Sequence, residues 1–344
     1  MPKSVWLFSE GSAKDNTLLG NKGANLCEMT ALNLPVPFGF IITTEACLEY
    51  NRLGEKLPEG LMDEVMQAIT EIETRFGKKF ANAKDPLLVS VRSGAAVSMP
   101  GMMDTILNLG LNDEICEGLA QKTGNPGFAY DTYRRFLQMY GDVAQGLGNE
   151  KYESVLADYK RAKKYNNDLQ MKAEEWSEIV ESYKNIFQPP LEPRVQLEKA
   201  IKAVFSSWQN PRAVRYRHFN DIPDNLGTAV IVQAMVFGNK GETSGSGVAF
   251  TRDPATGEKK LYGEYLLNAE GEDVVAGIRT PQNLHEFKTQ NPQLFEQLFQ
   301  MQEKLEQHYR DMQDLEFTIE EGKLFLLQTR RGKRTAKASV KIAV

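Results

Sequence analysis

Residues 228–252 read TAVIVQAMVFGNKGETSGSGVAFTR, and this stretch decides the class of fold. The apolar run Thr228–Phe237 predicts a β-strand, the glycine-rich residues 238–247 a loop, and Val248–Arg252 a second strand. After a turn, the run Lys260–Leu267 predicts a third strand. Because such short connections require antiparallel neighbours, we expect consecutive strands to pair here.

The preceding part of the chain alternates between strand and helix patterns. Residues 1–112 contain the strand-like runs Phe38–Thr44 and Leu87–Arg92, and Gly60–Phe76 has apolar residues at helical spacing. This mixture predicts an α/β or α+β subdomain.

The rest of the chain divides into a helical insert, a β-rich part and a short tail. Residues 113–195 have almost no strand pattern, and Asp131 is the expected N-cap of one of their helices. The prolines of Gln188–Pro193 cannot continue a helix and end this region. Residues 196–335 form the β-rich subdomain, and residues 336–344 are interpreted as the start of a linker.

The composition is typical of a folded protein with more than one domain. The chain has 344 residues, 41% hydrophobic and 25% charged, and a net charge of -5. This charge argues against a surface that coats nucleic acid or anionic lipid, but a local basic cleft remains open. No signal peptide or membrane-spanning window is evident, so we expect a cytoplasmic chain with no nucleic-acid or membrane partner.

Two further features concern the compartment and the end of the chain. Cys27, Cys47 and Cys116 are odd in number and widely spaced, which fits neither a disulfide framework nor a zinc site and indicates a reducing compartment. Residues 329–344 are basic, contain no acid and end on apolar residues. We therefore expect a chain cut at the start of a helix.

The glycine-rich residues 238–247 are a candidate phosphate cradle. Glycines between two strands let backbone N–H groups approach an anion closely. The segment is not a P-loop, because the chain has no G-x-x-x-x-G-K-[ST] string, and it is not a dinucleotide fingerprint, because Gly245-Ser-Gly247 lacks the third glycine. A merely mobile loop is the alternative.

The hairpin formed by residues 315–319 and 324–328 is a candidate metal site. A three-residue loop would pair Glu316 with Gln328 on one face, whereas a two-residue loop would pair Glu316 with Leu327 and turn Gln328 away. We expect the three-residue loop. The two side-chain oxygens, with Asp314 nearby, would suit Mg²⁺, which takes few protein oxygens plus phosphates. The alternative is a solvated sheet face.

Three cations are candidates for binding phosphate. Arg92 and Arg330 are expected at strand ends, where arginine can bind phosphate bidentately, although ordinary surface ion pairs would explain both. Lys22 lies just before a predicted helix, where an anion is favoured, although a solvent-exposed lysine is the alternative. The segment Ser98–Met103 is interpreted as a flexible lid or as loop packing. The three histidines are interpreted as structural.

Several strings together resemble the nucleotide-binding domain of the pyruvate, phosphate dikinase family, over essentially the whole chain. They are LLGNKGANL (18–26), VSVRSGA (89–95), SMPGMMDTILNLG (98–110), GETSGSGVAFTR (241–252), HYRDMQDLEFTI (308–319) and LQTR (327–330). The long methionine-rich string distinguishes this family from the related phosphoenolpyruvate synthases, which carry a shorter, acidic loop. The resemblance implies an ATP-grasp-like α/β (α+β) fold in which ATP lies between two α/β parts, with an inserted helical subdomain.

The resemblance also implies a reaction and its partners. The β,γ-diphosphate of ATP passes to a histidine on a swivelling domain, orthophosphate takes one phosphoryl group to give diphosphate, and a barrel domain passes the other to pyruvate. The products are AMP, diphosphate and phosphoenolpyruvate. The acceptor histidine and the barrel are expected outside these 344 residues, and a homodimer of the full-length enzyme is left open. The alternatives are a stand-alone ATP-binding regulatory module and the nucleotide domain of a related dikinase such as phosphoenolpyruvate synthase.

By the same resemblance, individual residues take roles. Lys22, Arg92 and Arg330 are implied as phosphate clamps and catalytic residues, and Glu316 and Gln328 as Mg²⁺ and phosphate partners. The remaining implied residues are Asp314, Glu264 and Asp273 as polar supports, Ser246 and Gly247 in the glycine-rich loop, Gly101 in the lid, and Gln233, Met235 and Val236 in a hinge strand beside adenine. Two positions depart from the family pattern. Ala96 replaces an expected basic residue, and Ser246 replaces the usual threonine.

Overall fold

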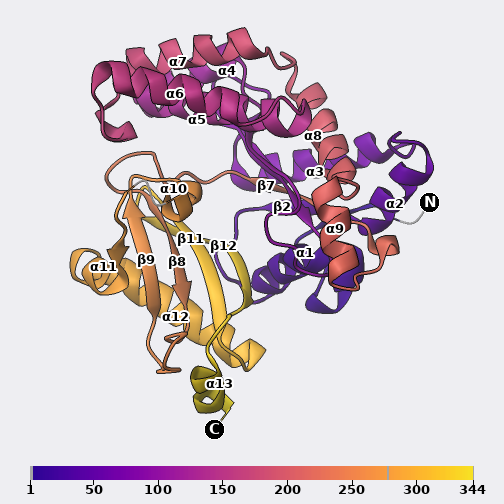
Figure 1. Cartoon of the computed structure of the whole chain (residues 1–344), viewed down its shortest axis with the longest axis vertical. Coiled ribbons are helices and arrows are strands. Elements are labelled where there is room, and N and C mark those ends of the chain that lie inside the picture. Colours follow the sequence, from indigo (N-terminus) through magenta and orange to yellow (C-terminus); the bar gives the residue numbers. More distant parts are fainter. Residues whose placement is uncertain (1–2, 277–278, 344) are drawn as a thin grey trace. The chain divides into compact units, whose positions relative to one another are not determined.

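The computed structural model describes residues 3–276 and 279–343, which form two compact units of mixed α/β structure (Figure 1). The first unit is Met1–Ala24 with Phe38–Met235, and the second is Asn25–Pro37 with Val236–Val344. Each unit contains one five-stranded sheet. The unit boundary therefore differs from the predicted division after residue 195, because residues 196–235 belong to the first unit.

The sheet of the first unit is antiparallel throughout, with the order β1-β2-β7-β5-β6. Its strands are β1 (Val5–Leu7), β2 (Gly39–Ile42), β7 (Ala229–Ala234), β5 (Val89–Gly94) and β6 (Thr105–Leu109). β7 lies between β2 and β5, and its residues are buried along its whole length. Both hydrogen-bonding edges of β7 are occupied, so the next strand of the chain cannot pair with it. The expected hairpin across residues 238–247 is wrong.

The helices of the first unit follow their apolar spacing. The helix expected at residues 60–76 is α3 (Leu61–Phe76), which buries Leu61, Val65, Ile69 and Ile72 and ends at Gly77 in the left-handed conformation. The other elements are α2 (Thr44–Arg52), α4 (Asp113–Thr123), α5 (Pro126–Met139), α6 (Glu150–Lys163), α7 (Ala173–Ile186), α8 (Pro193–Ser207), α9 (Pro211–Phe219), β3 (Lys79–Phe80) and β4 (Pro86–Leu87). Helix α1 (Asn16–Ala31) begins in this unit and ends in the second.

Helices α4–α7 gather in one bundle, which Figure 1 shows at one end of the first unit. The expected N-cap at Asp131 is wrong: α5 begins at Pro126, and the Asn125 side chain accepts the N–H of Phe128 at 3.1 Å. Asp131 lies inside the helix, where its carboxylate accepts hydrogen bonds from Arg134 (2.8 Å) and Arg135 (3.1 Å). Proline at the first helical position explains the earlier start, since it needs no N–H partner there.

The sheet of the second unit has the order β10-β9-β8-β11-β12 and is also antiparallel. Its elements are β8 (Gly245–Phe250), β9 (Tyr262–Leu267), α10 (Gly271–Ala276), β10 (Gln282–Asn283), α11 (Leu284–Gln290), α12 (Pro292–Tyr309), β11 (Gln313–Glu320), β12 (Lys323–Arg331) and α13 (Ala336–Ala343). One face is apolar: Tyr265 of β9 stacks with Phe317 of β11 at 6.2 Å and contacts Phe287 of α11 at 4.7 Å between ring centroids. The other face carries Asp314, Glu316, Gln328 and Arg330 on β11 and β12, and apolar residues such as Leu266 elsewhere.

Candidate functional site

Arg92 lies on the polar face of the first sheet. In the register of β5 and β7, Ser90 opposes Gln233 and Arg92 opposes Ile231, so Arg92 and Gln233 share a face. The intervening Val91 and Val232 point to the opposite face and are fully buried. The sequence suggested that Arg92 ends its strand, but β5 continues to Gly94.

Lys22 lies over the same face of this sheet. Helix α1 is interrupted at Gly20 (φ 68°, ψ 157°), so Lys22 occupies the first turn of the segment that follows the break. The Asn21 N–H donates to the Ala95 carbonyl at 2.9 Å. A Cβ placed on Gly94 would lie 3.7 Å from the Cβ of Lys22, and Gly94 shares its face with Arg92. The structure thus brings the two predicted cations of the first unit together beside a helix start.

The methionine-rich segment is anchored at its C-terminal end. Arg212 of α9 donates to the Met102 carbonyl at 3.2 Å and pairs with Asp104, which also accepts the Asn210 amide at 3.2 Å. Burial raises the pKa of the Asp104 carboxyl, although Arg212 opposes the shift. Gly101, by contrast, is exposed at φ 70° with open space around it. Arg212 therefore holds this loop at its C-terminal end, while a Cβ on Gly101 would have no heavy atom within 4 Å.

The predicted hinge residues lie at the end of β7. Gln233 is buried within the strand, and the Met235 N–H donates to the Leu88 carbonyl at 2.9 Å after the strand has ended. The boundary between the two units falls between Met235 and Val236. A role for these residues beside adenine stays a prediction.

Glu316 and Gln328 meet in the second unit, as predicted, although not through a three-residue loop. The turn has two residues, Glu321 (φ 47°) and Gly322 (φ 76°), as a type I′ hairpin requires. Phe317 opposes Leu326 but Glu316 opposes Gln328, so Leu327 is the extra residue of a β-bulge. The Gln328 amide donates to the Glu316 carboxylate at 2.9 Å.

Arg330 joins the same polar face and has a partner there. It lies within β12 opposite Asp314, and not after the strand as expected. Its Nε donates to the Asp314 carboxylate at 2.6 Å, with the Arg330 side chain 47% exposed and the Asp314 side chain 10% exposed. The cation is thus held at a defined position on the sheet while remaining accessible to solvent.

The register extends this polar face to β8 and β9. Val248 of β8 opposes both Glu316 of β11 and Glu264 of β9, so Glu264 shares the face of Glu316, two strands away. Helix α10 covers part of this face through Val274, which packs with Leu266. On the same helix, the Asp273 carboxylate accepts the Glu270 N–H at 3.0 Å and so caps the helix start.

Ser246 and Gly247 lie in strand β8 and not in a loop, which corrects their predicted setting. The Ser246 hydroxyl is buried at 3.1 Å from that of Thr318. Gly247 faces the apolar side, where a Cβ would lie 2.4 Å from the Phe317 ring. Packing against this ring explains the glycine without any ligand.

Lys240 of the glycine-rich loop was missed by the sequence analysis. Its ammonium pairs with Glu320 (2.9 Å) and Glu321 (2.7 Å) at the tip of the β11–β12 hairpin. Burial alone would lower the pKa of Lys240, but Glu321 and Glu320 outweigh it and raise the pKa. No sequence signal links residues 80 positions apart, so only the fold could show this anchor of the loop.

Comparison with known proteins identifies the family. The family model for the pyruvate phosphate dikinase AMP/ATP-binding domain matches residues 52–296 and 291–344. Pyruvate, phosphate dikinase from Clostridium symbiosum is 56% identical over 100% of this chain and 40% of its own length. The enzyme from Rhizobium meliloti is 53% identical, over 100% of this chain and 41% of its own length. This chain belongs to the pyruvate, phosphate dikinase family.

The match covers the nucleotide-binding part of the family's proteins. The chain spans about two fifths of the length of these curated relatives; a chloroplastic relative from Arabidopsis thaliana is 52% identical over 99% of the chain and 36% of its own length. The mixed α/β architecture with its helical bundle is the ATP-grasp-like fold with a helical subdomain. No helix in the part of the chain that the structure describes is long and apolar enough to cross a membrane.

The donor set on the second sheet fits the Mg²⁺ that the family implies. Glu316 and Gln328 offer a carboxylate and an amide oxygen side by side, and Mg²⁺ commonly takes one or two protein oxygens together with substrate phosphates. Within residues 3–276 and 279–343, no group of three or more His, Cys, Asp or Glu residues is arranged to hold a metal ion by itself.

Proposed function

We propose that this chain binds Mg²⁺-ATP and transfers the β,γ-diphosphate of ATP to a histidine carried outside these residues. The observation that carries the proposal is the bulged β11–β12 hairpin, which puts Glu316, Gln328, Asp314 and Arg330 on one polar sheet face. Oxygen donors for a metal next to an accessible arginine are what a polyphosphate requires.

We assign roles in each unit separately. In the first unit, Lys22 and Arg92 bind phosphate oxygens, Gln233 and Met235 lie beside adenine, and Gly101 allows the methionine-rich segment to approach the triphosphate. In the second unit, Arg330 stabilises charge on the group in transfer, and Asp314 orients Arg330 through the 2.6 Å contact.

The remaining residues of the second unit support the polar face. Glu316 and Gln328 hold Mg²⁺, which neutralises phosphate charge, while Glu264, Asp273 and Ser246 support the surrounding shell. The backbone of Val236 continues the adenine-binding segment, and Gly247 serves packing.

The overall reaction belongs to the proposal as well. Orthophosphate would take one phosphoryl group from the histidine, and the other would reach pyruvate at a separate domain to give phosphoenolpyruvate, in line with the names of the relatives. We also propose a cytoplasmic location, supported by three cysteines that are buried and unbridged.

Calorimetry with ATP, with and without Mg²⁺, tests the binding site. We expect ATP to bind at least tenfold more tightly with Mg²⁺, and Glu316→Gln to remove most of that difference because the metal then loses its carboxylate. Glu286→Gln, an exposed site on α11, is the matched control and should behave like wild type. Equal ATP affinity with and without Mg²⁺ would contradict the metal assignment.

A transfer experiment separates the dikinase from a regulatory ATP-binding module. The chain is mixed with a separately produced phosphohistidine domain of a relative and with ATP labelled at either the β or the γ phosphorus. Diphosphoryl transfer puts both labels on the acceptor domain. Transfer of the γ label alone, or ATP binding without any transfer, would overturn the proposed reaction.

A further inference from the structure

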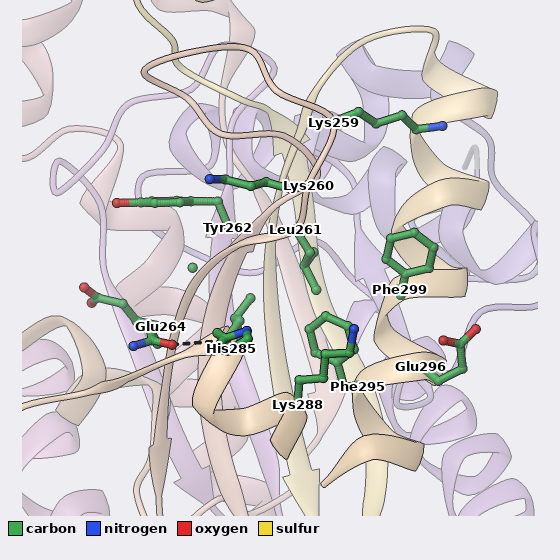
Figure 2. A pocket seen from close by; sticks show the side chains of 13 residues that line it. Lys259, Lys260, Leu261, Tyr262, Glu264, His285, Lys288, Phe295, Glu296 and Phe299 are labelled. Carbon is green, nitrogen blue, oxygen red and sulfur yellow. Dashed lines mark hydrogen bonds between the residues drawn. The ribbon is translucent and has the colours of Figure 1, made fainter. Parts of the chain in front are cut away.

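A cavity of about 650 Å³ lies in the second unit, at the outer part of its sheet between β9 and helices α11 and α12 (Figure 2). Of the residues assigned to the nucleotide, only Glu264 lines it. A volume of this size is typical of small-molecule sites. Nothing in the proposed reaction uses this cavity.

The cavity exists because the sheet ends early on this side. β10 pairs with β9 only at Glu264 and Tyr265, whereas β8 pairs with β9 along its whole length. Within the described residues, the backbone of residues 262–263 therefore has a neighbouring strand on one side only. Helices α11 and α12 flank the open side and form the opposite wall.

Aromatic and aliphatic side chains form the walls. Phe295 and Phe299 are one helical turn apart on α12, and both remain partly exposed. Figure 2 shows them across the cavity from Leu261, the residue before β9. Tyr262 is 49% exposed and points to the opposite side of the view from the two phenylalanines. Aromatic surface that is only partly covered gains most from a flat apolar group placed against it.

Lysines surround these walls, and their present partners are weak. Lys259 lies 3.3 Å from Glu303 and Lys260 lies 3.5 Å from Glu258, with both lysine side chains more than half exposed. Lys288 of α11 lies over the Phe295 ring, 5.2 Å from its centroid. Exposed ion pairs of this kind contribute about 0–1 kcal/mol each. A ligand anion can therefore replace their partners at little cost.

The two acidic side chains that line the cavity, Glu264 and Glu296, lie away from its centre. In Figure 2 the carboxylates of Glu264 and Glu296 lie at opposite sides of the view, away from the Phe295 ring, while His285 lies between β9 and α12. The centre of the cavity thus combines apolar walls with the Lys288 ammonium and the His285 imidazole, while Lys259 and Lys260 point to opposite sides of the view.

We infer that this cavity binds a small organic anion with an aromatic body, of the class of aromatic phosphate esters. The aromatic ring packs between Leu261 and the two phenylalanines, and the phosphate lies at Lys288, with Lys259 and Lys260 adding positive charge at the rim. Inorganic phosphate would leave the apolar walls uncovered, and a neutral aromatic molecule would leave the lysines unused. Both parts of the ligand are therefore needed.

The test uses the fluorescent ester 1-naphthyl phosphate, added to the chain in the presence of saturating Mg²⁺-ATP. We expect saturable binding that weakens with added salt, and at least tenfold weaker binding of inorganic phosphate and of 1-naphthol. AMP, added as a competitor under the same conditions, distinguishes a nucleoside monophosphate from other aromatic phosphates: displacement of the probe assigns the cavity to nucleoside monophosphates, and no displacement assigns it to the other esters.

Variants locate the binding. The triple change Lys259→Gln, Lys260→Gln and Lys288→Gln alters only exposed side chains and should weaken 1-naphthyl phosphate binding at least tenfold. Phe299→Ser should weaken it similarly, while Lys337→Gln and Lys341→Gln, exposed on α13, should leave it unchanged. Glu316→Gln should also leave it unchanged, which separates this site from the proposed metal site. Wild-type affinity in the triple lysine variant, or binding of 1-naphthol as tight as that of its phosphate, would overturn the inference.

Discussion

Replacing Arg330 with leucine should separate transfer from binding and folding. If Arg330 stabilises charge on the group in transfer, its contact strengthens in the transition state relative to bound ATP. We expect the Arg330→Leu variant to bind ATP within a few-fold of wild type and to transfer the diphosphate roughly 10²-fold more slowly. That loss corresponds to about 3 kcal/mol, the usual range for one lost electrostatic stabiliser.

The structure bounds the accompanying cost in stability. Arg330→Leu removes the 2.6 Å contact to Asp314, whose side chain is only 10% exposed. A hydrogen bond to a charged group contributes about 1.5–3 kcal/mol. Because the Arg330 side chain is 47% exposed and water reaches it, we expect the low end, about 1–2 kcal/mol, and a melting temperature lower by about 3–6 °C. This cost cannot unfold the protein at assay temperature.

The assay is single-turnover transfer of labelled phosphate from ATP to an added phosphohistidine domain. Arg331→Leu is the matched control, because Arg331 is adjacent, 77% exposed and paired with Asp311 at 2.7 Å. It should transfer like wild type. The double variant Asp314→Asn, Arg330→Leu removes both charges. If it restores transfer to near wild type, Arg330 serves only to neutralise Asp314, and the catalytic assignment is refuted.

Three further predictions concern a buried carboxylate, a glycine at positive φ and the anchor of the methionine-rich segment. Burial alone would raise the pKa of Asp131, but Arg135 and Arg134 lower it to about 2 from 3.8, so its contribution to stability is present above about pH 4 and is lost as the pH falls towards 2. Asp131→Asn should accordingly reduce the free energy of unfolding by about 2–3 kcal/mol at pH 7, and urea titrations should show the gap to wild type closing below pH 4, whereas a gap independent of pH would contradict the ion pairs. Gly20→Ala would place a Cβ 1.8 Å from the Gly94 carbonyl oxygen and should lower the free energy of unfolding by more than about 3 kcal/mol. The control Gly77→Ala has a similar positive φ but open space around it, and should lower the free energy of unfolding by about 1 kcal/mol in the same titration. Equal losses would mean that only φ matters. Arg212→Ala frees the Met102 carbonyl and Asp104, so amide exchange at residues 98–104 should accelerate at least tenfold, with the exposed Arg215→Ala on the same helix as control; unchanged exchange would show that other contacts hold the segment.

The regular elements could be predicted where one periodicity dominated. The helix at residues 60–76 was found within one residue, because Val65, Ile69 and Ile72 repeat at helical spacing and all become buried. The same reasoning predicted which side chains of β11 share a face, because Glu316 lies between Leu315 and Phe317 in strict alternation.

Pairing between distant segments could not be read from such patterns. Strand β7 is apolar except for Gln233 and is buried along its whole length, and that pattern fits any central strand. Its neighbours are β2 and β5, which lie far away in the sequence, so nothing local indicated that β8 would join another sheet. Lys240 illustrates the same limit, since its partners Glu320 and Glu321 come from a remote turn.

The pairing of Glu316 with Gln328 was predicted correctly, but from the wrong turn length. The sequence allows two registers, one for a two-residue turn and one for a three-residue turn. The structure has the two-residue turn, Glu321 and Gly322, which by simple alternation would place Gln328 on the face opposite to Glu316. The bulge at Leu327 adds one residue to β12 and so turns the later side chains to the opposite face. Gln328 and Arg330 therefore share a face with Glu316 and Asp314. Neither the turn nor the alternation alone would assemble these four side chains. The polar face therefore depends on one extra residue in β12, whose own side chain takes no part in it.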